Sequence, residues 1–218
     1  MFVIQNLYRI LGYCCLKTHW LMVVPRLELL RQVENFVVHF LKKNLPPTRF
    51  FHNIDHTRQV VEQSQLLASH YSISDIDLNA LSIAAWFHDT GYCKGNIEHE
   101  EESVNIALAF LQGYDLEPNY RSDIQSLIMT TKLPSKPETL VQKILCDADM
   151  CHLGAADYET RSLLLKEELE ATKGCTISDD DWVRQNISFF RAHHYFTDVA
   201  KKLWKRQKQN NLFWLLDQ

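Results

Sequence analysis

Three short segments concentrate the side chains that can bind a metal ion or transfer a proton. They read FHNIDH at residues 51–56, WFHD at 86–89 and CDADM at 146–150. Each lies at the start or end of a helix predicted from apolar residues at spacings of three and four. Two imidazoles and two carboxylates suit a divalent ion such as Mn²⁺, Fe²⁺, Mg²⁺, Ni²⁺ or Zn²⁺. If these segments converge, the sequence therefore predicts a metal centre.

The apolar spacing turns the histidines of the first two segments toward the interior. His52 and His56 lie four residues apart, so a helix through both would place them on one face. His56 also heads the apolar stripe of the predicted helix 54–71, and His88 falls on the core-facing side of its own helix. Asp89 follows directly, and a buried carboxylate beside an imidazole is costly unless a cation or a good partner compensates it.

Either aspartate of CDADM could be the more distant carboxylate ligand. Asp149 lies four residues after Leu145 and eight after Val141, on the apolar stripe of its helix. Asp147 follows Lys143 by four residues, which gives it less reason to face the core. We expect Asp147 to orient a ligand imidazole or to pair with a helix end. The spacing therefore favours Asp149 as the ligand.

Taken in this order, the segments resemble the HD superfamily of metal-dependent phosphohydrolases. FHNIDHTRQVV is similar to the H-N-x-x-H segment of the cyclic-nucleotide phosphodiesterase branch, and AAWFHDTGY, HEEES, TTKLP and CDADMCHLG together look like a small bacterial-type HD family. The likeness covers about residues 27–172. It implies an all-α HD fold that hydrolyses phosphomonoesters or phosphodiesters, often of nucleotides, with one or two divalent ions. By position, the implied metal ligands are His56, His88, Asp89 and Asp149.

The resemblance also implies catalytic roles. His52 matches the histidine that protonates the leaving group, and an imidazole can donate a proton near neutral pH. Asp89 joins the catalytic set, because neighbouring residues on a helix point about 100° apart and one of the His-Asp pair could bridge to a second ion. Lys132 could steady a phosphate, or be an ordinary surface lysine. His99 is a further candidate, although HEEES could instead be an acidic helix start.

Two other functions stay open at this point. One is an HD-fold oxygenase with a mixed-valent di-iron pair, for which His99 and His52 would be the additional ligands. The other is a non-catalytic module that binds a metal or nucleotide. Asp147, like His99, is kept as an additional site position, whereas we expect Glu167, Glu168 and Glu170 to form a solvated face.

The elements that must position these residues are predicted to be helical throughout, in one all-α domain. Pro25 is predicted to start the first long helix and Pro46-Pro47 to end it. We therefore divide the chain into an N-terminal helical extension, 1–24, and an HD domain, 25–218. The remaining helices are predicted at about 54–71, 75–91, 99–112, 119–131, 137–148, 156–172, 179–191 and 196–216.

The composition indicates which partners and which cellular environment to expect for this domain. The net charge is −4 over 218 residues, which argues against non-specific nucleic-acid binding, and the six cysteines form no CxxC pair. We expect reduced thiols in a cytoplasmic protein whose partner is a small phosphorylated substrate, with a homodimer left open. The apolar N-terminus is interrupted by Arg9 and Lys17, so its uncharged run is far shorter than the roughly 20 residues of a membrane span. A membrane-surface helix is the alternative there.

The C-terminal stretch KKLWKRQKQ is rich in basic residues. We expect it to form a solvated helix face, and an anionic partner is the alternative.

Overall fold

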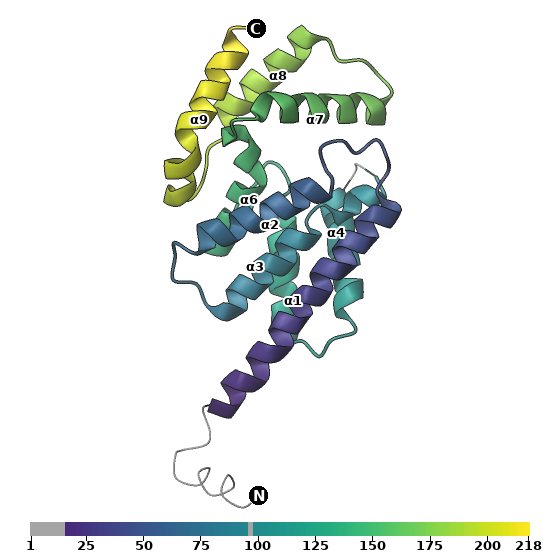
Figure 1. The fold of residues 1–218 in the computed structure, drawn as a ribbon, viewed down its shortest axis with the longest axis vertical. Coiled ribbons are helices and arrows are strands. Elements are labelled where there is room, and N and C mark those ends of the chain that lie inside the picture. Colours follow the sequence, from purple (N-terminus) through teal and green to yellow (C-terminus); the bar gives the residue numbers. More distant parts are fainter. Residues whose placement is uncertain (1–15, 96–97) are drawn as a thin grey trace, which may run out of the picture.

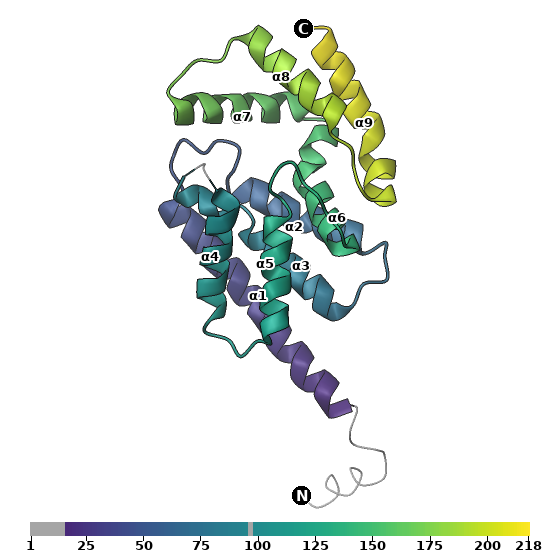
Figure 2. The ribbon, with the colours of Figure 1, turned by 180° about the vertical axis from the view of Figure 1, so that it is seen from behind.

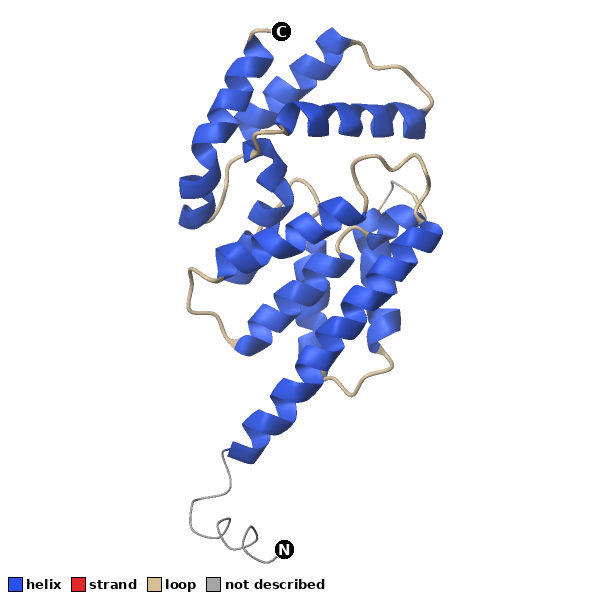
Figure 3. Cartoon of the chain, viewed as in Figure 1, coloured by secondary structure: helices blue, strands red, loops and turns tan. Residues whose placement is uncertain are grey.

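The computed structural model describes residues 16–95 and 98–218, and this part of the chain is helical without a strand (Figures 1 and 3). The predicted all-α class is confirmed. The helices are α1 Leu16–Asn44, α2 Ile54–Ala68, α3 Asp75–Phe87, α4 His99–Leu111, α5 Pro118–Met129, α6 Leu140–Asp149, α7 Tyr158–Lys173, α8 Asp179–Ala192 and α9 Asp198–Leu216, with short 3₁₀ helices η2 Thr90–Cys93 and η3 Met150–Gly154.

The first helix differs from its predicted bounds. It begins at Leu16 and continues through Pro25, where the sequence predicts a start. Proline fixes φ near the helical value, so it can stand inside a helix at the cost of one backbone hydrogen bond. The predicted boundary between residues 24 and 25 thus falls within α1, and residues 1–15 of the predicted extension lie outside the described part of the chain.

Helix α3 forms the centre of a bundle made by α1 to α6 (Figure 2). Every residue of α3 from Ala80 to Phe87 is buried, which is the pattern of a helix that is covered on all sides. Its neighbours are α1, α2, α4, α5 and α6. Any polar side chain at the end of α3 therefore lies in the interior of the bundle.

Helices α7, α8 and α9 form a C-terminal lobe beyond one end of this bundle (Figures 1 and 2). The lobe has a small core of its own, made by Leu153, Tyr158, Phe190 and Leu215. Helix α9 packs closely on η3, since a Cβ at Gly154 would lie only 2.5 Å from the Trp204 Cβ atom. Among the described residues, no helix combines the length and the apolar character that crossing a bilayer would need.

Candidate functional site

His88 and Asp89 leave the end of α3 inside the bundle. His88 is fully buried, and its Nδ1 lies 2.8 Å from the Ala85 carbonyl oxygen. Because a carbonyl can only accept, Nδ1 donates this bond and Nε2 is the ring nitrogen left to face a cation. The carboxylate of Asp89 lies against this nitrogen, with Oδ2 3.2 Å from His88 Nε2. The pair is therefore oriented to share a cation.

Helix α2 brings His56 to the same point. The Asn53 side chain caps α2 by accepting hydrogen bonds from the backbone N–H groups of Asp55 and His56, at 2.8 and 3.2 Å. This cap places His56 in the first turn, where it is buried. Its Nε2 lies 3.3 Å from Asp89 Oδ2 and 3.4 Å from His88 Nε2. In H-N-x-x-H, the asparagine thus sets the helix start that positions the second histidine.

Asp149 is the last residue of α6, and its side chain reaches the same point. Its Oδ1 lies 3.2 Å from His56 Nε2 and 3.6 Å from His88 Nε2. One ligand atom from each of His56, His88 and Asp149 falls within 4.8 Å of the others. The structure therefore brings together all four predicted ligand positions, which we call the metal cluster: His56, His88, Asp89 and Asp149.

The electrostatics of the metal cluster favour a cation. Burial would lower the pKa of His88, but the Asp89 and Asp149 carboxylates together outweigh burial and raise that pKa well above its ordinary value. Burial would likewise raise the pKa of Asp89, but His88 and His56 hold it well below its usual range. Asp89 Oδ2 has no hydrogen bond from any described residue, although it is buried. Two ionised carboxylates facing two imidazole nitrogens in the interior call for a positive charge between them.

A divalent transition ion fits these donors. Bond lengths of about 2.0–2.2 Å place neighbouring ligand atoms about 3.0 Å apart in octahedral geometry and about 3.4 Å apart in tetrahedral geometry. The nitrogen–oxygen distances in the metal cluster run from 3.2 to 3.6 Å. The donor set and its spacing therefore match what such an ion requires.

His52 lies in the loop before α2, so the predicted helix face shared with His56 is wrong. Helix α2 begins at Ile54, and the two imidazoles instead meet edge to face, with ring centroids 5.7 Å apart. His52 Nδ1 lies 2.6 Å from Glu168 Oε1 on α7. Since an ionised carboxylate only accepts, Nδ1 donates this bond and Nε2 is the remaining ring nitrogen.

Glu168 is a buried anchor for this loop. It also accepts hydrogen bonds from the backbone N–H groups of Phe51 and His52, each at 2.9 Å, and from Arg49 Nη1 at 3.1 Å. Burial would raise the pKa of Glu168, but the hydrogen bond and charge of His52 outweigh burial and lower it to about 2. The predicted solvated face is therefore wrong at Glu168, whose side chain is 1% exposed.

The neighbouring glutamates behave differently. Glu167 is exposed, as predicted. Glu170 is half-buried and accepts a hydrogen bond from the Ile177 backbone N–H at 2.7 Å.

Tyr92 of η2 lies between two imidazoles. Its ring centroid is 4.3 Å from that of His52 and 3.9 Å from that of His99, with interplanar angles of 29° and 17°. Two rings this close cannot share one face of the tyrosine, so they flank it. His99 Nε2 also lies 3.7 Å from Asp89 Oδ1, and burial lowers the pKa of His99. HEEES is also an acidic helix start, since α4 begins at His99 and has three glutamates in its first turn, of which Glu100 is buried.

Two predicted residues lie apart from the metal cluster. Lys132 is exposed at the edge of the site and forms an ion pair with Glu101. Asp147 is fully buried, and its carboxylate accepts hydrogen bonds from Phe196 N at 2.7 Å and from Thr197 N and Oγ1 at 2.7 and 2.6 Å. The expectation that spacing turns Asp147 away from the interior is wrong. It holds the start of α9 and not a ligand imidazole.

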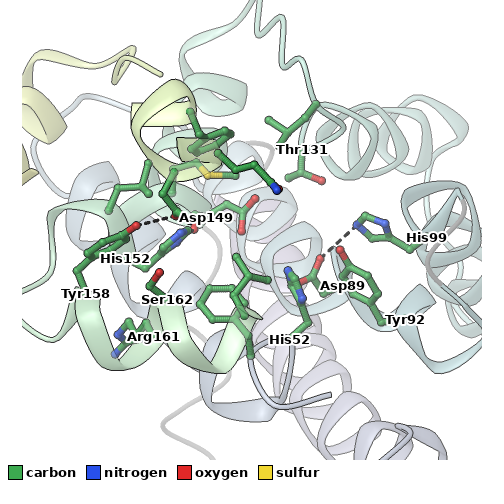
Figure 4. Close-up of a pocket in the computed structure, with 18 of the residues that line it drawn as sticks. His52, Asp89, Tyr92, His99, Thr131, Asp149, His152, Tyr158, Arg161 and Ser162 are labelled. Carbon is green, nitrogen blue, oxygen red and sulfur yellow. Dashed lines mark hydrogen bonds and ion pairs between the residues drawn. The ribbon is translucent and has the colours of Figure 1, made fainter. Parts of the chain in front are cut away.

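A cavity of about 580 Å³ opens between the bundle and the C-terminal lobe. Figure 4 shows His52, Asp89, Tyr92 and His99 on one side of this cavity and Tyr158, Arg161 and Ser162 of α7 on the other, with Asp149 and His152 between them. Burial lowers the pKa of His152 to about 4, so this imidazole is neutral at pH 7. One cavity therefore joins the metal cluster to His52.

Comparison with known proteins shows where similar sequences and folds occur. Residues 53–154 match the family model of the HD domain. Similar folds occur in a predicted HD superfamily hydrolase from an uncultured Thermotogales bacterium (20% identity, TM-score 0.59, 86% of this chain and 89% of the other), in a Lactobacillus plantarum protein (16%, 0.64, 86% and 93%) and in Bacillus subtilis YpgQ in complex with ADP (15%, 0.60, 88% and 94%). At these identities the likeness establishes the fold. No curated protein matches the chain.

The segment 53–154 is therefore identified as an HD domain of the HD superfamily. The members of this superfamily include metal-dependent hydrolases, and the His, His, Asp cluster of this chain is of the kind that such proteins use to hold a metal.

Several residues of the site are given no role in it by the sequence predictions. Glu168 could have been found, since it follows Leu164 by four residues and Leu165 by three and so shares their apolar face. The roles of Tyr92 and Arg49 depend on ring stacking across separate elements, and no local pattern indicates them.

Proposed function

We propose that the protein is a metal-dependent phosphohydrolase that cleaves a phosphomonoester or phosphodiester, with a nucleotide or cyclic nucleotide as substrate. The observation that carries this proposal is the convergence of the metal cluster and His52 on one cavity. When bound, a divalent ion (Mn²⁺, Mg²⁺, Fe²⁺, Ni²⁺ or Zn²⁺) supplies Lewis acidity toward a phosphoryl oxygen and makes a water molecule more acidic. His99 Nε2 lies 3.7 Å from Asp89 Oδ1, and this pair of donors supports the proposal of a second ion.

The nucleotide part of this proposal has separate support. A cavity of about 580 Å³ lies within the roughly 300–1,000 Å³ of small-molecule sites. A protein of similar fold, YpgQ, forms a complex with ADP.

His52 is the proposed acid for the leaving oxygen. Glu168 receives its Nδ1–H, which fixes the ring and leaves Nε2 to carry the proton that is donated. Asp89 and the other members of the metal cluster hold the ion, and Asp89 would also face the substrate because it lines the cavity. Lys132, at the rim, would exchange Glu101 for a phosphate oxygen.

We propose that this activity requires the whole of residues 25–218, with 1–24 as an extension. The cavity is lined by residues between 51 and 189 in sequence, so it extends beyond the segment 53–154 that defines the HD domain.

Metal analysis and hydrolysis together test the function. Purified protein should contain at least one transition ion per chain, and His88→Ala should remove it while circular dichroism stays helical. The metal-loaded protein should release phosphate or open a ring in a panel of phosphomonoesters, cyclic nucleotides and dinucleotides with Mn²⁺ or Mg²⁺. A protein that binds none of Mn²⁺, Ni²⁺ and Zn²⁺ in titration calorimetry would refute the proposal and favour a non-catalytic module.

A further inference from the structure

The part of the cavity farther from the metal cluster has an apolar and aromatic lining. It lies between α7 and α8 and the end of η3, and Figure 4 shows Tyr158 and Ser162 on this side. We call five of its lining residues the ring subsite: Leu153, Tyr158, Leu165, Trp182 and Phe189. Three aromatic rings and two aliphatic side chains therefore face the same space.

The polar atoms around the ring subsite are already bonded to one another. The Tyr158 hydroxyl donates to Asn186 Oδ1 at 2.7 Å, and Asn186 Nδ2 donates to the Trp182 carbonyl oxygen at 2.8 Å. The Trp182 indole N–H donates to Ser162 Oγ at 2.9 Å. These bonds fix two of the three rings and use the donors of both, the O–H of Tyr158 and the indole N–H of Trp182.

The neighbouring cation, Arg161, is also held in place by hydrogen bonds. Arg161 Nε donates to both carboxylate oxygens of Asp157 at 2.9 Å, and its Nη1 donates to Gln59 Oε1 at 2.6 Å. Gln185 also lines the cavity, but it is exposed at the surface rather than set within the ring subsite.

We propose that the ring subsite binds the organic group of the substrate, that this group is an aromatic ring system, and that it is recognised by its faces and not by hydrogen bonds at its edge. This inference rests on the phosphohydrolase function, since it assigns the phosphate to the metal cluster. Offset stacking and apolar contact need no polar partner, and the O–H of Tyr158 and the N–H of Trp182 are already donated to neighbouring side chains. The protein would then accept esters of different aromatic groups and discriminate against sugar and alkyl phosphates of similar charge.

A pair of phosphonates that differ only in the ring tests this proposal. Titration calorimetry on the full chain would compare 1-naphthylmethylphosphonate with methylphosphonate, both with Mn²⁺ and with a chelator. Burying a ring of roughly 150 Å² predicts at least about 100-fold tighter binding of the naphthyl compound. Leu165→Ala should weaken the binding of the naphthyl compound about tenfold and leave the affinity for methylphosphonate unchanged. Leu163→Ala, on the same helix but 51% exposed, is the matched control and should change neither.

The outcomes separate this proposal from the proposed function. If the protein fails to bind metal or to hydrolyse any ester, but keeps the naphthyl preference and its sensitivity to Leu165→Ala, the ring subsite stands and the hydrolase function falls. Equal affinity for the two phosphonates, or no binding of the naphthyl compound, overturns the ring subsite whatever the metal does. Gln185→Ala should change naphthyl binding less than twofold. If it instead selectively weakens the binding of AMP relative to UMP, the edge of the ring is read and the proposal is wrong.

Discussion

The buried carboxylate of Glu168 gives a stability prediction whose size follows from the structure. Its pKa is about 2 in the folded protein against an ordinary value of 4.5. A difference of about 2.5 units corresponds to about 3 kcal/mol, at about 1.36 kcal/mol per unit. The side chain is only 1% exposed, so screening by solvent reduces this free energy only slightly. We therefore expect Glu168→Gln to lower the free energy of unfolding at pH 7 by about 3 kcal/mol.

The same shift predicts how this contribution depends on pH. Because the folded-state pKa is depressed, the folded protein binds fewer protons than the unfolded chain between about pH 2 and 4.5. The contribution of Glu168 is complete above about pH 4.5 and decreases as the pH falls, until it is lost below about 2. The stability difference between the wild type and Glu168→Gln should therefore be constant above pH 5 and should shrink in acid.

Urea unfolding followed by circular dichroism at pH 7, 4 and 3 would measure this difference. Glu167→Gln is the matched control, because Glu167 is the exposed neighbour on the same helix and should change stability by no more than about 0.5 kcal/mol. A loss below about 0.5 kcal/mol in Glu168→Gln would refute the reasoning. So would a difference between the wild type and this variant that stays the same from pH 7 to pH 3.

Three further predictions concern the site and its supports. His52→Ala should keep the metal and lose on the order of 10²–10⁴ in rate, less with p-nitrophenyl phosphate, whereas His56→Ala should lose metal; equal metal loss in elemental analysis would make both residues ligands. Asp149→Asn should abolish most metal binding in calorimetry, whereas Asp147→Asn should bind metal normally and lose about 2–4 kcal/mol in urea unfolding, and the reverse pattern would exchange their roles. Gly91→Ala would place its Cβ 1.9 Å from a backbone oxygen of α4, so we expect at least about 3 kcal/mol of destabilisation, and an unchanged melting temperature would contradict this.

His56, His88 and Asp149 of the metal cluster could be predicted because each follows the periodicity of the helix that carries it. His56 heads an apolar stripe, and His88 follows a helix that is buried on all sides. Asp149 continues the stripe of α6. A local pattern is enough to turn each side chain inward, and a compact bundle then has one interior in which they can meet.

The surroundings of His52 could not be predicted in this way. Its partner Glu168 is 116 residues away along the chain, and the bond depends on how α7 crosses the loop before α2. The cap at Asn53 starts α2 one residue after His52, so helical spacing does not apply to His52. The prediction for Asp147 fails for a related reason, because Asp147 faces the C-terminal lobe, whose position is set by tertiary contacts alone.

The site divides between the HD domain and the chain that follows it. The segment 53–154 contains the whole metal cluster, whereas the carboxylate that fixes His52 and most of the ring subsite belong to α7 and α8. Helix α7 carries both Glu168 and Leu165, which are three residues apart and so lie on neighbouring parts of one face. A displacement of α7 would move the support of the proposed acid together with the wall that contacts the organic group. Under the proposed function, we therefore expect substitutions that reshape the ring subsite to lower kcat as well as raise KM.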